Sequence, residues 1–505
     1  MSSVKEPVMH RFGNGLTVLI KEDKSHPVVS LQYWVGTGSM NEGHLQGSGI
    51  SHLLEHLVFK GTENYSGQDL ARKVQERGGH WNAYTSVNRT VFYIDGPAES
   101  WQVFLNLLTE LVFSPTFPEG ELEREKEVVR REMAMYADEP DSVAYQLLMQ
   151  TLYLKHPRRW PGLGQPAVFD TLTREDVLEY HASRYVPNNV VLSIAGDVDA
   201  REVLSHLELL VEDLKARPLN REPLPHEPHQ FGSRTVRKEF AVPYSKLSLA
   251  WRLPCSAHPD TPALSALASI LGGGRSARFY EKFHDRLGLV YSIEVHSNQS
   301  ESDEGAFTIT MDVDRAQRDK VRDLVLQELR DLEREDFTED LKRVCKQTRV
   351  SRLSRKSSAS GMASEMGADW FGARNLNLSS EWQEAIERVT SEDLHRVCAG
   401  WLSSPNVTEV SLDPLGSNAE EVPSGSEKTD TVLSELVLSN GLKVVVREDH
   451  RLPLAHVCLV FKAGCPAENE QNAGVTDLMS ECLLKGTSTR SASDIARFLE
   501  DIGGA

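Results

Sequence analysis

The order of apolar and polar positions near the start of the chain predicts strands followed by a helix. Asn14-Gly15 has the sequence of a tight hairpin turn, and the apolar, β-branched run at 16–20 predicts the strand that follows it. A second apolar run at 28–35 predicts another strand. The glycine-rich Gly47-Ser48-Gly49 then begins a predicted helix that runs to Phe59.

The following segments predict a second helix, a strand pair and a long charged helix. Ser66 with Asp69 three residues later is typical of a helix N-cap. Residues 80–86 and 90–94 predict paired strands, and 121–136 predicts a charged helix. Helices and strands alternate without a clear βαβ rhythm. We therefore expect an α+β fold, in which helices pack on mostly antiparallel β-sheet.

The first predicted helix carries the sequence His52-Leu53-Leu54-Glu55-His56. Residues four apart share one face of a helix, so His52 and His56 can bind one metal ion from the same side. Glu55 lies close enough to reach a metal-bound water. This H-x-x-E-H order reverses the H-E-x-x-H motif of many zinc peptidases. The alternative is a surface helix with two solvated histidines.

The end of the chain repeats its beginning. Residues 12–18 have a counterpart at 438–444, and Lys60-Gly61-Thr62 recurs as Lys485-Gly486-Thr487. A long, nearly constant offset with matching turn residues indicates duplicated domains. Only the first copy carries the imidazoles, because the positions of His52, Glu55 and His56 are occupied in the second copy by Asp477, Ser480 and Glu481.

Two segments rich in proline, glycine and serine divide the chain. The predicted parts are a zinc-binding catalytic α+β domain at 1–216, a proline-rich linker at 217–230, a second homologous α+β domain at 231–414, a flexible linker at 415–432, and an incomplete third domain at 433–505 that repeats the first without the zinc motif. Since the third domain stops just after its Gly503-Gly504 turn, we expect a fragment of a longer protein or a truncated gene product.

Composition and charge limit the classes of binding partner and the cellular locations that we expect. With 505 residues the chain exceeds the usual size of a single core. Its formal net charge of -19 argues against nucleic acid and anionic membranes as main partners. No apolar run approaches the roughly 20 residues of a membrane span, and the first residues do not have the pattern of a signal peptide. We expect a cytoplasmic protein without membrane insertion.

Together these motifs resemble the pitrilysin family of inverted-motif zinc peptidases (inverzincins), which includes insulin-degrading enzyme and the mitochondrial and bacterial processing peptidases. In that family the histidine motif is followed some 76 residues later by a glutamate, with another glutamate seven positions earlier. Glu132 and Glu125 stand at these positions. Further matches are Phe59-Lys60-Gly61-Thr62, Asn82-Ala83-Tyr84-Thr85, and, in the second domain, 272–278 and 288–292.

The resemblance implies one Zn²⁺ per chain, held by His52, His56 and Glu132. Zinc lowers the pKa of water, and Glu55 then acts as general base in peptide hydrolysis. Glu125 is expected to hydrogen-bond a ligand histidine. The alternative for Glu125 and Glu132 is two carboxylates on a solvated helix.

The resemblance also implies substrate contacts. Asn82 and Ala83 lie on the strand expected to pair with an extended peptide, although an ordinary hairpin is the alternative. Tyr291 belongs to the second-domain signature. His284 replaces an arginine that the family often places seven residues before this tyrosine, so Tyr291 is either a substrate contact or a structural relic.

The predicted function is therefore a zinc metalloendopeptidase acting on peptide substrates or unfolded segments. The resemblance implies a clamshell of two halves, in which a second half or a partner chain closes the chamber. The alternative is a non-catalytic zinc-binding subunit or scaffold of a processing-peptidase-like assembly.

Overall fold

The computed structural model describes residues 6–219, 223–299, 304–402, 405–416, 433–447, 460, 468, 474–483, 485–491 and 494. The chain divides into two compact units, Met1–Val422 and Pro423–Ala505. Most of the predicted flexible linker, from 417 to 432, lies outside the described residues, as does the Gly503-Gly504 turn.

The first sheet has six strands in the order β1-β2-β6-β3-β5-β4. Their bounds are β1 Val8–Arg11, β2 Thr17–Glu22, β3 Val28–Val35, β4 His80–Thr85, β5 Thr90–Pro97 and β6 Val190–Gly196. Neighbouring strands are antiparallel except for β2 and β6, which are parallel. Strand β4, which carries the predicted substrate residues, ends the sheet on one side.

The second sheet has five strands in the order β7-β11-β8-β10-β9. Their bounds are β7 Arg234–Phe240, β8 Ser245–Leu253, β9 Val290–Asn298, β10 Gly305–Val313 and β11 Thr408–Pro414. Apart from β1, which has no counterpart, the second sheet has the same strand order as the first. The parallel pair β7 and β11 corresponds to the parallel pair β2 and β6. The predicted α+β class with repeated domains is confirmed. The exact domain boundaries stay predictions.

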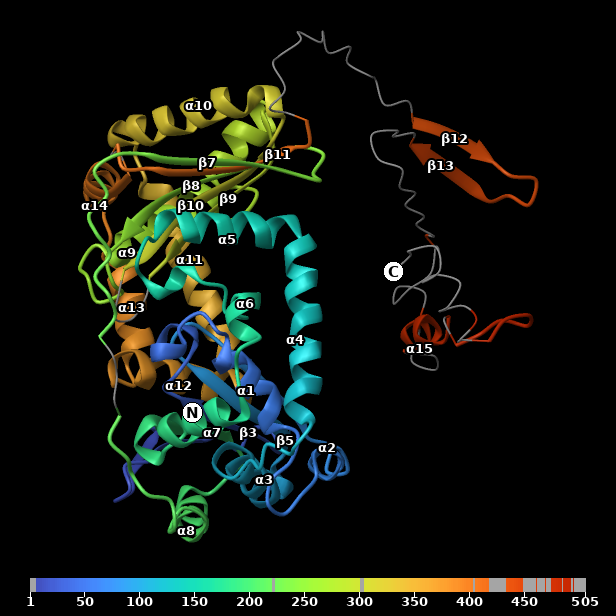
Figure 1. Ribbon diagram of the computed structural model, residues 1–505. Coiled ribbons are helices and arrows are strands. Elements are labelled where there is room, and N and C mark those ends of the chain that lie inside the picture. The colour runs from blue at the N-terminus through green and yellow to red at the C-terminus, as the bar shows by residue number, and fades with distance from the viewer. Residues whose placement is uncertain are drawn as a thin grey trace. The chain divides into compact units, whose positions relative to one another are not determined.

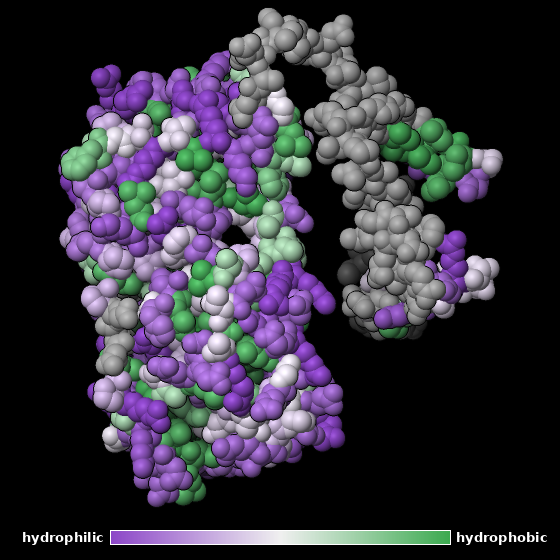
Figure 2. Space-filling view, viewed as in Figure 1, coloured by the Kyte–Doolittle hydropathy of each residue, from purple (hydrophilic) through white to green (hydrophobic). Residues whose placement is uncertain are grey.

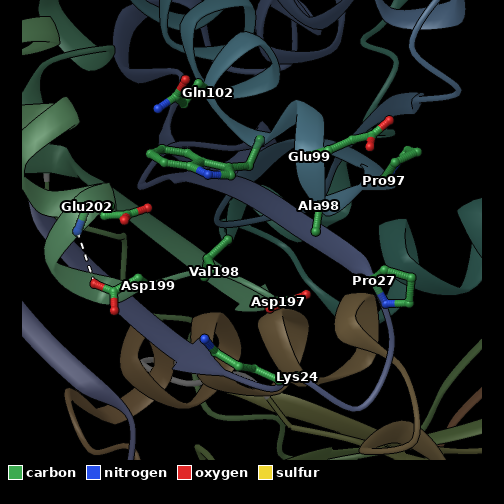
Figure 3. Close-up of a pocket in the computed structure, with 11 residues that line it drawn as sticks. Lys24, Pro27, Pro97, Ala98, Glu99, Gln102, Asp197, Val198, Asp199 and Glu202 are labelled. Atoms are coloured by element: carbon green, nitrogen blue, oxygen red, sulfur yellow. Dashed lines mark hydrogen bonds between the residues drawn. The ribbon is translucent and has the colours of Figure 1, made fainter.

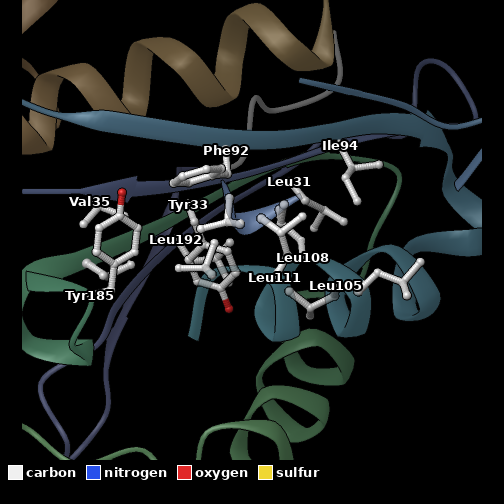
Figure 4. Packing of buried hydrophobic residues seen from close by; sticks show 14 of the residues in the cluster. Leu31, Tyr33, Val35, Phe92, Ile94, Leu105, Leu108, Leu111, Tyr185 and Leu192 are labelled. Carbon is white, nitrogen blue, oxygen red and sulfur yellow. The ribbon is translucent and has the colours of Figure 1, made fainter. Parts of the chain in front are cut away.

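Both faces of the first sheet are buried, because alternate residues of each strand enter two different hydrophobic clusters. On β3, Leu31, Tyr33 and Val35 face the core that includes α3 (Trp101–Phe113), as Figure 4 shows. Trp34 belongs to the cluster on the opposite face. This explains why seven consecutive residues of β3 are buried, a pattern expected of a strand covered on both sides.

Each sheet is covered on one face by a helix that the chain forms between two strands of the other sheet. Helix α12 (Ala359–Ala373) packs on the first sheet, where Ala363 and Met366 contact the cluster around Trp34. Helix α5 (Pro140–Leu152) crosses the second sheet, with Leu148 and Met149 against its β-strands (Figure 1). This exchange interlocks the two halves of the first unit.

Two helices bring the histidine motif and the distant glutamates together. Helix α1 (Ile50–Val58) packs between strand β4 and helix α4 (Glu121–Asp138), and α4 leads directly to α5 (Figure 1). The remaining α-helices of the first unit are α2 Gly67–Gln75, α6 Pro166–Phe169, α7 Arg174–Arg184, α8 Ala200–Leu210, α9 Thr261–Gly272, α10 Arg318–Asp331, α11 Thr338–Arg355, α13 Leu378–Glu387 and α14 Ser391–Val397.

The last residues of the predicted linker at 217–230 pack against the folded unit. The Glu227 carboxylate accepts hydrogen bonds from the backbone N–H groups of 154–156, at 2.6, 2.8 and 2.9 Å. Gln230 donates its side-chain amide to the backbone oxygen of Asn406 at 2.9 Å. These bonds tie the end of the segment to the residues that follow α5 and to those that precede β11.

In the second unit, β12 (Leu433–Val437) pairs with β13 (Lys443–Arg447) across a turn of the same geometry as the turn between β1 and β2. Gly15 and Gly441 both have left-handed φ angles, 91° and 84°. Helix α15 (Val475–Cys482) begins after Gly474, which is left-handed like Gly49 before α1. The repeat seen in the sequence therefore extends to local backbone geometry.

Candidate metal centre and active site

Helix α1 presents two imidazoles on one accessible face. Its N-cap residue Gly49 has a φ of 73°, and a Cβ there would lie 2.1 Å from the backbone oxygen of Leu163, so this position requires glycine. Leu53 and other apolar residues anchor the helix in the core. The rings of His52 and His56 lie 4.7 Å apart, and their side chains are 19% and 20% exposed.

Glu132 reaches both imidazoles from α4. Its Oε2 lies 3.9 Å from Nε2 of His52, and its Oε1 lies 3.9 Å from Nε2 of His56. One donor atom from each of the three residues lies within 4.8 Å of the others. Ligand atoms of a tetrahedral zinc are about 3.4 Å apart. Two imidazole nitrogens and one carboxylate oxygen at this spacing fit a zinc ion.

The environment keeps His52 in the form that a metal needs. Burial, and to a smaller degree the nearby His56, lowers the pKa of His52 to about 4. Its imidazole is therefore neutral at pH 7, with a lone pair available for a metal. Within the described residues, the buried Nδ1 of His52 has no hydrogen-bond partner.

Glu125 contacts the other imidazole. Its Oε2 lies 3.2 Å from Nδ1 of His56, and its Oε1 lies 2.7 Å from Nζ of Lys60. Glu125 is two helical turns before Glu132, so both carboxylates project from α4 toward α1. Glu125 is expected to hydrogen-bond a ligand histidine, and the structure places it beside His56. No sequence signal indicates its contact with Lys60.

Glu55 is held by a threonine at the end of β4. The hydroxyl of Thr85 donates a hydrogen bond of 2.5 Å to Oε2 of Glu55. Burial raises the pKa of the Glu55 carboxyl, and the bond from Thr85 opposes this rise. The sequence alone does not indicate this contact, although Thr85 is the threonine of the Asn82-Ala83-Tyr84-Thr85 match.

A second residue that the sequence did not reveal is Glu42, which lies before α1. The residue is 2% exposed, and its carboxylate accepts backbone hydrogen bonds from Gly47, Gly49 and Ser51 at 3.2, 3.2 and 3.1 Å. Burial raises the pKa of Glu42 to about 7, against the effect of these bonds. Glu42 thus binds two N–H groups just before α1 and, within its first turn, the N–H of Ser51, for which the glycine N-cap has no side-chain acceptor.

Asn82 and Ala83 lie on the end strand β4, next to α1. Trp81 packs edge-on against Phe59 with ring centroids 4.8 Å apart, which fixes the strand to the end of that helix. The Oδ1 of Asn82 accepts a hydrogen bond of 2.8 Å from the backbone N–H of Ala83. Pairing of these residues with a peptide stays a prediction.

Tyr291 lies on a different sheet. It is on β9, the end strand of the second sheet, and is 53% exposed. Its hydroxyl donates to Oδ1 of Asp314 at 2.9 Å, and its ring lies 5.3 Å from that of Tyr244. These contacts do not connect Tyr291 with the metal-binding group, and its role toward substrate stays a prediction.

A cavity of about 820 Å³ opens at the other end of the first sheet (Figure 3). It lies between the turn before β3, the segment between β5 and α3, and the start of α8. Glu99, Asp197 and Glu202 make its lining acidic, with Lys24 opposite them. None of the predicted site residues lines it. The face of the first unit that Figure 2 shows is mostly hydrophilic, with small apolar patches.

Comparison with known proteins places these features in a family. The model described as "Insulinase (Peptidase family M16)" matches residues 17–162 and 443–505, and the model described as "Peptidase M16 inactive domain" matches 171–347. The first model therefore matches both copies of the repeat. Within the described residues, no helix is both long and apolar enough to cross a membrane.

Relatives and solved structures agree with this assignment. An uncharacterized zinc protease of Rickettsia felis is 27% identical over 75% of this chain and 91% of its own length. The zinc protease PqqE of Helicobacter pylori is 27% identical over 79% of this chain and 91% of its own. The crystal structure of a protease from Helicobacter pylori is similar with a TM-score of 0.75 and 26% identity, and covers 81% of this chain and all of that one.

Proposed function

Because the chain belongs to the M16 family of peptidases, we propose that it is a zinc-dependent metalloendopeptidase that hydrolyses peptides or unfolded segments. The observation that carries this proposal is the convergence of His52, His56 and Glu132, with the Glu55 carboxylate on the same helix as the histidines. A general base beside three metal ligands is the arrangement that metal-assisted hydrolysis requires.

His52, His56 and Glu132 would hold one zinc ion per chain. When bound, zinc supplies Lewis acidity, which lowers the pKa of water and polarises a peptide carbonyl. Three protein ligands are the number that catalytic zinc sites typically use. The accessible imidazoles allow a peptide to approach from solvent.

Glu55 moves the proton. It takes a proton from the attacking water as the oxygen bonds to the peptide carbon, and it delivers that proton to the leaving amine as the C–N bond breaks. Thr85 holds Oε2 of Glu55, so the other carboxylate oxygen is left for the transfer. Burial of Glu55 favours the protonated form that the second step needs.

Strand β4 is the element best placed to align an extended peptide. It ends the first sheet and packs beside α1. Pairing with a strand edge uses backbone groups first and side chains second, so we expect broad specificity. Before a peptide can pair there, the Asn82 side chain must release the N–H of Ala83.

The experiment that tests the proposal combines metal analysis with cleavage of an internally quenched peptide. Glu55→Gln is expected to abolish cleavage while leaving zinc near one per chain, because the amide cannot take up a proton. Turnover by the zinc-loaded variant would refute the general-base role. Zinc binding without cleavage in the wild-type chain would favour the alternative, a non-catalytic zinc-binding subunit of a processing-peptidase-like assembly.

A further inference from the structure

A continuous line of polar contacts runs from a lysine outside the metal-binding group to one of its histidines. Nζ of Lys60 lies 2.7 Å from Oε1 of Glu125, and Oε2 of the same carboxylate lies 3.2 Å from Nδ1 of His56. Lys60 follows the C-terminal end of α1, His56 lies on α1, and Glu125 lies on α4. The line therefore connects the two helices that carry the metal-binding residues.

Glu125 needs both of these partners. Its side chain is 7% exposed, and a buried carboxylate is costly unless donors occupy its oxygens. Lys60, which is 31% exposed, supplies the positive charge and fixes one oxygen. The other oxygen is thereby turned toward His56. Without the lysine, one oxygen of a nearly buried carboxylate loses its donor, and the side chain is free to turn.

The orientation of Glu125 controls which nitrogen of His56 can bind metal. A hydrogen bond from Nδ1–H to a carboxylate fixes the imidazole tautomer and leaves the lone pair on Nε2. In His56 this Nε2 is the atom that faces Glu132. His52 does not have an equivalent partner among the described residues, because its Nδ1 is buried without a hydrogen bond.

We propose that Lys60 is a positioning residue of the metal centre, which sets the affinity for zinc by holding Glu125 against His56. The inference rests on the proposed function, since it concerns the same three metal-binding residues. Lys60 is the lysine of the Phe59-Lys60-Gly61-Thr62 match, and the hydrolytic mechanism by itself assigns no role to it.

A purely structural role for the lysine is the competing explanation. Lys485 stands at the corresponding position of the repeat, where no imidazoles occur, and it is exposed. A cation just after a helix C-terminus is favourable in itself because of the helix dipole. A test must therefore separate an effect on metal binding through Glu125 from a general effect on folding.

A double-mutant cycle on zinc affinity makes this separation. Zinc dissociation constants are measured by competition with a chromophoric chelator for the wild type, Lys60→Met, Glu125→Gln and the double variant. Loss of an outer partner of a metal ligand typically weakens binding about 10–100-fold, so we expect about tenfold for Lys60→Met. Glu125→Gln must weaken binding at least as much. In the Glu125→Gln background, Lys60→Met is expected to have no further effect.

Lys60→Arg is the matched control, because it keeps the charge and must retain most of the affinity. Melting temperatures of the metal-free proteins establish that the variants are folded, and Glu125→Gln tests the same line of contacts if Lys60→Met does not fold. Unchanged affinity in Lys60→Met, or an equal loss in both backgrounds, would overturn the inference alone. A wild-type chain that binds no zinc would overturn the proposed function as well.

Discussion

Thr85 and Glu55 are joined by a hydrogen bond of 2.5 Å, which connects the last residue of β4 to the middle of α1. The two residues come from elements with different expected roles, the peptide-binding strand and the helix of the histidine motif. Thr85 lies two residues after Ala83, so both side chains face the same side of the strand. A movement of β4 on peptide binding would therefore shift the Glu55 carboxylate through its bond to Thr85.

We predict that Thr85→Val lowers kcat by about 10–100-fold and leaves KM nearly unchanged, because a general base that is free to turn is displaced from its reacting position. Valine keeps the shape of threonine and removes only the hydroxyl. Steady-state cleavage of a quenched peptide at saturating zinc provides the measurement. Thr85→Ser, which restores the hydroxyl, should recover most of kcat. An unchanged kcat in Thr85→Val would show that the bond does not position Glu55.

The sequence predicts the local elements of the first sheet well, because their signals are local. The predicted strand at 28–35 has the bounds of β3, and the charged helix expected over 121–136 is α4, which ends two residues later. Gly15, in the turn before β2, and Gly49, at the N-cap of α1, both have left-handed φ angles. They stand where the sequence predicts a turn and the start of a helix. Periodicity also places Glu125 and Glu132 on one face of α4, as the contacts of both carboxylates with His56 require.

Contacts between distant parts of the chain could not be predicted in this way. Gln32 bonds to Ser364 across 332 positions, and no period in the sequence assigns α12 to the first sheet rather than the second. Glu42 gives no signal either, since a single acid in a loop is ordinarily solvated. Only the folded chain shows that its oxygens meet the N–H groups before and within the first turn of α1.

Glu42 gives a pH-dependent prediction. Its pKa is about 7 in the folded chain, against an ordinary value of 4.5, so the folded state binds this proton more tightly than the unfolded state does. The stabilisation is complete below pH 4.5 and is lost as the pH rises through 7. Glu42→Gln does not titrate. The melting temperature of the variant, measured relative to the wild type, should therefore rise between about pH 5 and about pH 8.

The reverse trend for Glu42→Gln would have a clear meaning. If the wild type gains stability over the variant as the pH rises, the three backbone N–H groups outweigh burial and keep the carboxylate ionised at about pH 5. A difference that does not depend on pH would mean that Glu42 does not titrate in this range.

The contact between Trp34 and Gly367 gives a prediction for the interlocked sheets. A Cβ at Gly367 would lie 2.3 Å from Cε2 of the Trp34 indole, which is too close for any real contact. Trp34 projects from β3 toward α12 and is buried there. Gly367→Ala must push α12 away from the first sheet, and overpacking of this kind costs about 1–3 kcal/mol. Gly400→Ala, where a Cβ would meet nothing within 4 Å, is the control. We expect Gly367→Ala to lower the melting temperature and Gly400→Ala to leave it unchanged or slightly higher. Equal melting temperatures for the two variants would mean that the helix does not press on the sheet at this point.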